Sequence, residues 1–99
     1  MATEQAIVAA IHQVEHPEIA MTLVDLGMVR DVVVEEDGVT LTLVVPFAGI
    51  PEAIRNYLVN SLYQAVVSQG STLKKVYLAE MNEPERQAFF DKEHAYWRQ

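Results

Sequence analysis

Two of the three histidines, His12 and His16, lie four residues apart near the start of the sequence. On a helix this spacing places both imidazoles on one face, where such a pair can bind zinc. A catalytic metal needs a third ligand in an enclosed site. The helical pattern instead turns the pair away from the apolar stripe and toward solvent. We therefore predict a solvent-exposed face, and keep His12 and His16 only as weak candidates for a metal site.

The other candidates are single groups. His94 has no serine and acid beside it that would complete a catalytic triad. Asp25 lies in a turn where its carboxylate can accept main-chain N–H bonds and Gly27 can supply a positive φ. A functional role for Asp25 stays open, because its turn would lie beside residues 46–50 if both are at the same end of a sheet.

Composition narrows the function further. The 99 residues, with about half of them apolar, are typical of one globular domain, residues 1–99. There is no cysteine, which removes thiolate metal sites and thiol nucleophiles and fits a reducing cytoplasm. A formal charge of −7 disfavours binding to nucleic acid. The N-terminus lacks the basic start of a signal peptide and no segment is long enough to span a membrane, so we expect a cytoplasmic protein.

Hydrophobic periodicity and cap residues predict the elements that would position these groups. Thr3 and Asn82 are expected to cap helices, and Asp37-Gly38 indicates a hairpin. Pro17 is expected to end the first helix. The predicted helices cover residues 3–15, 51–70 and 83–99, and the predicted strands cover 28–35, 39–45 and 72–80. The fold class is α+β, a single small domain in the order α-β-β-α-β-α, with helices packed on a three-stranded mixed sheet.

The segment from strand to helix, LTLVVPFAGIPEAI, has a loop without a hydroxyl, thiol, acid or base. The first N–H groups of the following helix lack intrahelical partners and carry the positive end of its dipole. Phe47 and Ile50 place apolar surface beside them. Two interpretations remain equal: these side chains close the core, or they form an exposed anchor for a partner.

The last predicted helix carries four aromatic side chains, at Phe89, Phe90, Tyr96 and Trp97. Their spacing favours packing within the chain, and an interface is the alternative because aromatic residues are enriched there.

The segments VEHPEI and VDLGMVRDVVVEEDGVTLTL, followed by a helix that begins at Pro51, resemble the metal–sulfur cluster assembly factor family, domain of unknown function 59. The family includes relatives of SufT, of PaaD and of the eukaryotic cytosolic iron–sulfur assembly component. The resemblance covers residues 6–80 and leaves the helix 83–99 outside it. Asp25 to Val29 match the family's D-L-G-L-V, and His16 stands where an acid is usual. The family's cysteine falls on Ala48 or Ile50, so this chain is a cysteine-less, divergent member and the cysteine-dependent role is not carried over.

The resemblance implies a non-enzymatic accessory protein that assists iron–sulfur or metal-cluster assembly through protein contacts. One alternative is a dedicated partner of an oxygenase system, as for PaaD, and another is a small enzyme with an acidic and histidine site. No cofactor is expected to be bound by this chain alone. The expected partner is a cluster-assembly component or a client metalloprotein, with a second copy of the chain as a further candidate. The predicted partner-binding residues are Phe47, Ala48, Gly49, Ile50, Asp25 and Gly27.

Overall fold

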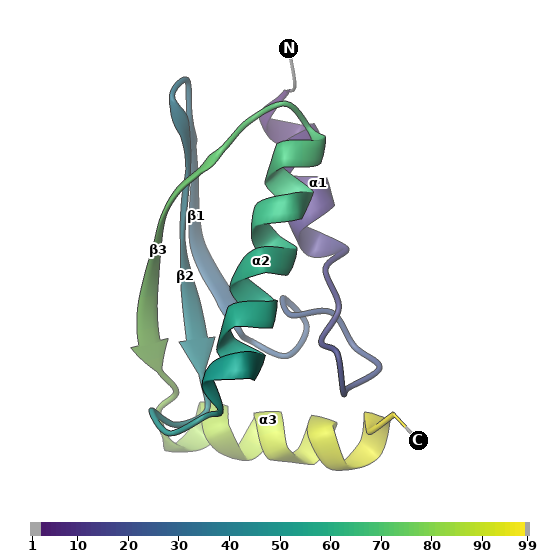
Figure 1. Cartoon of the computed structure of the whole chain (residues 1–99). Coiled ribbons are helices and arrows are strands. Elements are labelled where there is room, and N and C mark those ends of the chain that lie inside the picture. Colours follow the sequence, from purple (N-terminus) through teal and green to yellow (C-terminus); the bar gives the residue numbers. More distant parts are fainter. Residues whose placement is uncertain (1–2, 99) are drawn as a thin grey trace.

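A computed structural model describes residues 3–98 and contains three helices and three strands (Figure 1). The order α-β-β-α-β-α is the one predicted. The elements are α1 (Glu4–His12), β1 (Val29–Glu35), β2 (Gly38–Val45), α2 (Glu52–Ser68), β3 (Leu73–Glu80) and α3 (Glu83–Tyr96).

The strands form one mixed sheet in the order β1-β2-β3, which confirms the predicted fold class. β2 is antiparallel to β1 and parallel to β3, so α2 is the crossover between the two parallel strands. Figure 1 shows α1 and α2 on one face of the sheet, and α3 across the end at which β2 and β3 finish. The loop from β2 to α2 lies at that same end.

The core lies between β2 and the two helices that cover it. Seven of the eight β2 residues are buried, because β2 is the central strand and has neighbours on both sides. Each helix contributes its predicted apolar stripe, Ile7 and Ile11 from α1 and Leu58, Leu62 and Val66 from α2.

Local sequence signals explain where most elements begin. The Thr3 hydroxyl accepts the Ala6 N–H at 3.0 Å at the start of α1. Asn82 and Glu85 form a capping box at the start of α3. β1 and β2 are joined through Glu36 and Asp37, and Gly38 follows with φ +147°, a conformation that L side chains rarely adopt.

The first helix ends earlier than predicted, at His12 instead of residue 15. After it, the chain folds back on itself: the Leu23 N–H donates to Val14 O at 2.9 Å, and Glu15 pairs with Thr22. His16 is therefore not on the helical face of His12. The prediction of two exposed histidines on one face is wrong, because tertiary hydrogen bonds outcompete the last helical turn. His12 is exposed, whereas His16 has only 6% of its surface accessible.

The aromatic side chains of the last helix divide into two groups. Phe89 is buried at 4% exposure. The other three, Phe90, Tyr96 and Trp97, are exposed, so the expectation that most of this set packs inside the molecule is wrong. The end of the helix instead makes main-chain contacts with the connection after His16, in which the Ala20 N–H donates to Tyr96 O at 2.8 Å.

β3 is an edge strand with an open side. Tyr77 and Leu78 are each more than half exposed, although they point to opposite faces of the sheet. Within residues 3–98, no helix has the length and apolar character that a membrane span requires.

Candidate functional site

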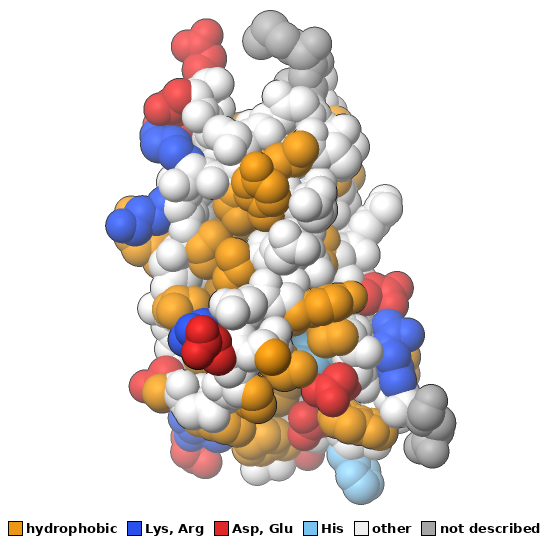
Figure 2. Space-filling view, viewed as in Figure 1, with side chains coloured by type: hydrophobic (Ala, Val, Ile, Leu, Met, Phe, Trp, Pro, Cys, Tyr) orange, Lys and Arg blue, Asp and Glu red, His pale blue; other side chains and the backbone are white. Residues whose placement is uncertain are grey.

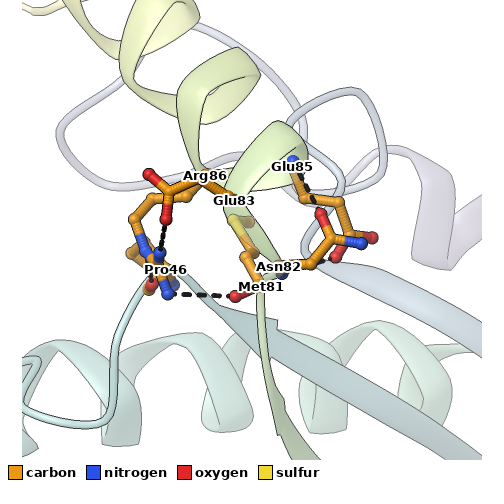
Figure 3. Close-up of polar contacts among 6 residues, drawn as sticks. All are labelled: Pro46, Met81, Asn82, Glu83, Glu85 and Arg86. Carbon is orange, nitrogen blue, oxygen red and sulfur yellow. Dashed lines mark hydrogen bonds and ion pairs between the residues drawn. The ribbon is translucent and has the colours of Figure 1, made fainter.

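The loop of residues 46–51 is held in place by a cation from α3 (Figure 3). The Arg86 guanidinium donates to Pro46 O at 2.7 Å and to Met81 O at 3.0 Å. It also forms an ion pair with Glu83 at 2.8 Å. Arginine suits this position because its planar fork can donate to several acceptors at once. The start of the loop and the start of α3 are thus fixed to one side chain.

A second contact holds the middle of the loop. The Ala48 N–H donates to Glu80 Oε1 at 2.8 Å, and Glu80 is the last residue of β3. A hydrogen bond to a carboxylate is stronger than one between neutral groups. The loop therefore has a defined conformation, set by polar residues that follow it in the chain by more than 30 positions.

The two apolar side chains of the loop differ in their surroundings. Phe47 is 44% exposed, whereas Ile50 is half-buried and packs against the core cluster. Of the two interpretations left open by the sequence, an exposed position holds for Phe47 and a core position largely holds for Ile50. Pro51 precedes α2 and supplies no side-chain cap to its first N–H groups.

A cavity of about 140 Å³ opens beside the loop. It lies among the loop, the first half of α2, the connection after α1, and α3. Most of its lining is apolar, from Met28, Pro46, Phe47, Ile50, Pro51, Ile54, Leu58, Phe89 and Phe90, and the polar lining is His16, Glu18 and Glu93. Figure 2 shows hydrophobic side chains gathered where the lower end of α2 meets α3, with acidic side chains among them.

His16 is the only titratable group of this cavity that is buried. Its Nδ1 accepts the Glu18 N–H at 3.0 Å, which fixes the neutral ring with its proton on Nε2. Burial lowers the pKa of His16 below its ordinary 6.5; the Glu18 charge opposes this shift and Arg98 adds to it. The ring is therefore held in its neutral form near neutral pH.

The remaining predicted residues lie outside this cavity. Gly27 has the expected positive φ, +78°. The prediction that the Asp25 carboxylate accepts N–H bonds in its turn is wrong for the described chain: the Thr22 hydroxyl accepts the Asp25 N–H at 3.1 Å. The main-chain oxygen of Asp25 instead accepts from Lys92 Nζ at 2.7 Å, which ties the turn to α3. Ala48 and Gly49 are exposed parts of the loop.

Between residues 3 and 98, no three histidine, aspartate or glutamate side chains lie close enough together to hold a metal ion. With no cysteine in the sequence, these residues do not fit an iron–sulfur cluster, which proteins hold mainly through thiolates.

Sequence reasoning missed Arg86, Glu80 and Glu93 as parts of the site. No short-range pattern could have found them, since each acts on residues far away in the sequence. For His16 the sequence holds one signal, the Pro17 that follows it, which predicts the end of a helix but not the burial of the imidazole.

Comparison with known proteins identifies the fold and the family. The family model described as iron-sulfur cluster assembly protein matches residues 4–69. The crystal structure of a domain of unknown function, DUF59, from Bacillus anthracis is similar with a TM-score of 0.60 and 22% sequence identity over 89% of each chain. Nothing among the curated proteins matches this sequence. The structural similarity supports the fold alone, whereas the family match runs from α1 to the end of α2, and the chain belongs to the iron–sulfur cluster assembly protein family.

Proposed function

We propose that this protein is a non-enzymatic accessory factor in iron–sulfur cluster assembly, and that it acts by binding another protein at the face formed by residues 46–51 and the adjacent cavity. The cluster in this scheme is the cargo of its partner. The chain itself supplies contacts, since it has no thiolate with which to hold a cluster.

The observation that carries the proposal is the ordered, exposed loop. Phe47 is 44% exposed, and the loop around it is fixed by Arg86 and Glu80. A loop that is already ordered loses less conformational entropy on binding, and an exposed aromatic side chain is a common anchor at interfaces. The apolar cavity beside Phe47 extends this surface inward.

The chemistry of the cavity gives less support to an enzyme. No hydroxyl or thiol nucleophile lines it. The Nδ1 of His16 accepts a main-chain N–H, so no carboxylate orients this ring as it does in a catalytic triad. Apolar walls and an exposed aromatic ring are what a docking surface requires.

The test is deletion of the gene in the native host, followed by assays of several iron–sulfur enzymes and of cofactor-free enzymes as controls. We expect the iron–sulfur enzymes to lose activity and cluster content while the controls stay normal. Re-expression of the wild-type chain should restore them, and re-expression of Phe47→Ser should restore them less. Normal cluster content in the deletion strain would refute the proposal, and a defect confined to one oxygenase would favour the dedicated-partner alternative.

A further inference from the structure

The carboxylates of the cavity have no positive partner within the described chain. Glu18 and Glu93 both line it, and neither forms an ion pair with a residue between 3 and 98. The basic side chains of this end of the molecule contact other groups: Arg86 is paired with Glu83 and Arg98 with Glu15, and Lys92 donates to Asp25 O. Two carboxylates without an ion-pair partner, beside apolar walls, favour a cation at this cavity.

The apolar part of the cavity accommodates a short hydrocarbon chain. Its volume of about 140 Å³ is close to the ~150 Å³ of an apolar cavity that accepts a benzene-sized molecule. Phe47 and Phe90 contribute aromatic rings, and Ile50 contributes an aliphatic wall. Lysine and arginine side chains combine an apolar stem with a charged head, and aromatic faces attract that head as well.

His16 adds a hydrogen-bond donor to the lining of the cavity. The side chain is only 6% exposed, and its Nδ1 is used by the Glu18 N–H. The Nε2–H has no acceptor among residues 3–98, and since no buried side-chain nitrogen or oxygen of these residues lacks a partner, this N–H lies where solvent or a ligand can reach it. A main-chain carbonyl of a bound peptide would supply this acceptor. A neutral imidazole also adds no positive charge that would repel a bound cation.

We propose that the cavity is a receptor for one basic side chain, lysine or arginine, presented by the partner protein. Its stem lies against Phe47, Ile50 and Phe90, and its charged head reaches Glu18 and Glu93. The carbonyl of the same segment accepts from His16 Nε2. This inference rests on the proposed function and specifies the chemistry of the partner.

The experiment is an NMR titration of the whole ¹⁵N-labelled protein with three capped amino acids: Nα-acetyl-arginine N-methylamide, its lysine analogue and the neutral norleucine analogue. We expect the two basic probes to shift the amides of Phe47, Ile50 and Phe90 in a saturable manner. The norleucine probe has an aliphatic stem without the charge. Its affinity should be lower than that of the arginine probe by at least about tenfold.

Two double variants test the carboxylates. Glu18→Gln with Glu93→Gln should weaken binding of the arginine probe by about tenfold, because both charges at the cavity are removed. Glu4→Gln with Glu36→Gln removes the same net charge at the opposite end of the sheet, where both residues are exposed, and should leave the affinity within about twofold. Dispersed amide spectra and unchanged melting temperatures establish that each variant is folded.

Equal binding of norleucine and arginine, or binding of none of the probes, would overturn the inference. An unaltered affinity in the Glu18 and Glu93 variant would overturn it as well. These results are separable from the proposed function. The deletion phenotype tests cluster assembly on its own, and a Glu18→Gln, Glu93→Gln chain that fully rescues a genuine deletion defect would refute only the receptor for a basic side chain.

Discussion

Arg86 Nε lies 2.7 Å from the carbonyl oxygen of Pro46, a residue 40 positions earlier in the chain. The same guanidinium donates to Met81 O, so one side chain connects the loop after β2 with the end of β3 and the beginning of α3. The exposed Phe47 follows directly after Pro46. The position of that ring is therefore set largely by a residue outside its own loop.

Arg86→Met should lower the free energy of unfolding by about 2 kcal/mol, because two partly buried carbonyl oxygens lose a charged donor. Arg55→Met is the matched control, since Arg55 is half-buried and has no ion pair or side-chain hydrogen bond with residues 3–98. Urea titration measures the stability, and hydrogen exchange of the Ala48 amide measures loop order. Equal stability in the two variants would show that the Arg86 hydrogen bonds to Pro46 O and Met81 O contribute little to the free energy of unfolding.

Phe47→Ser should change the free energy of unfolding by less than about 1 kcal/mol, because much of the ring is already in water. Ile50→Ser should cost about 2 kcal/mol, since Ile50 packs against the core. In the rescue assay, Phe47→Ser should perform poorly although it is folded. Tyr77→Ser, at a ring that is 54% exposed on β3, is the control and should rescue fully. Full rescue by Phe47→Ser would remove the loop from the partner interface.

His16 should make the folded state less stable in mild acid. Burial lowers its pKa below 6.5, with Glu18 opposing and Arg98 reinforcing the shift, while Glu93 faces the same cavity. As the pH falls below about 6.5, the unfolded chain binds a proton that the folded chain resists, so stability decreases until the pH passes the folded pKa. His16→Gln should flatten this slope, which begins as the pH falls through about 6.5.

The control for the pH experiment is His12→Gln, because His12 is exposed. The Asp37 and Lys74 pair does not interfere, since hydrogen bonding to Lys74 lowers the pKa of Asp37 below 3.8 and keeps it ionised throughout this range. Parallel pH profiles of the wild-type and His16→Gln proteins would contradict the assignment to His16.

Asp25→Ala should leave the free energy of unfolding within about 0.5 kcal/mol of the wild-type value, because the exposed carboxylate makes no hydrogen bond with residues 3–98. Thr22→Val should cost more, since the Thr22 hydroxyl accepts the Asp25 N–H. Thermal melts compare the two variants. A loss of about 1 kcal/mol in Asp25→Ala would restore the role of its side chain as a cap.

Anaerobic reconstitution of the isolated protein with iron and sulfide should yield no stable cluster, because the sequence has no thiolate ligand. Metal and sulfide analysis after gel filtration, together with the visible spectrum, measures the outcome. A brown protein with stoichiometric iron and sulfide would contradict the prediction and require ligands other than cysteine.

Much of the fold could be predicted because its signals are local. Thr3 and Asn82 cap their helices as expected, and the stripe of Leu58, Leu62 and Val66 follows from helical spacing. The helix boundary near His16 was missed because the chain there is shaped by tertiary hydrogen bonds. Periodicity contains no information about such contacts.

For the same reason, the sequence predicts the loop of the candidate site but not the residues that hold it. The loop of residues 46–51 stood out through its composition, but nothing near it in the sequence indicates that Glu80 and Arg86 hold it. The helix that carries Glu93 shows a pattern only in its aromatic residues, which does not indicate a role for this carboxylate. Its place beside His16 depends on how α3 crosses the end of the sheet.

The parallel pairing of β2 with β3 has a consequence for the order of folding. The β1–β2 hairpin is local and can form in microseconds, whereas β3 can join β2 only after the intervening helix has folded back over the sheet. Loop residues 46–51 are then ordered by Glu80 and Arg86, which leave the ribosome later still. A nascent or half-folded chain thus lacks the surface that we propose for docking. Engagement by a partner would therefore report that synthesis has passed Arg86 and that this end of the sheet has folded.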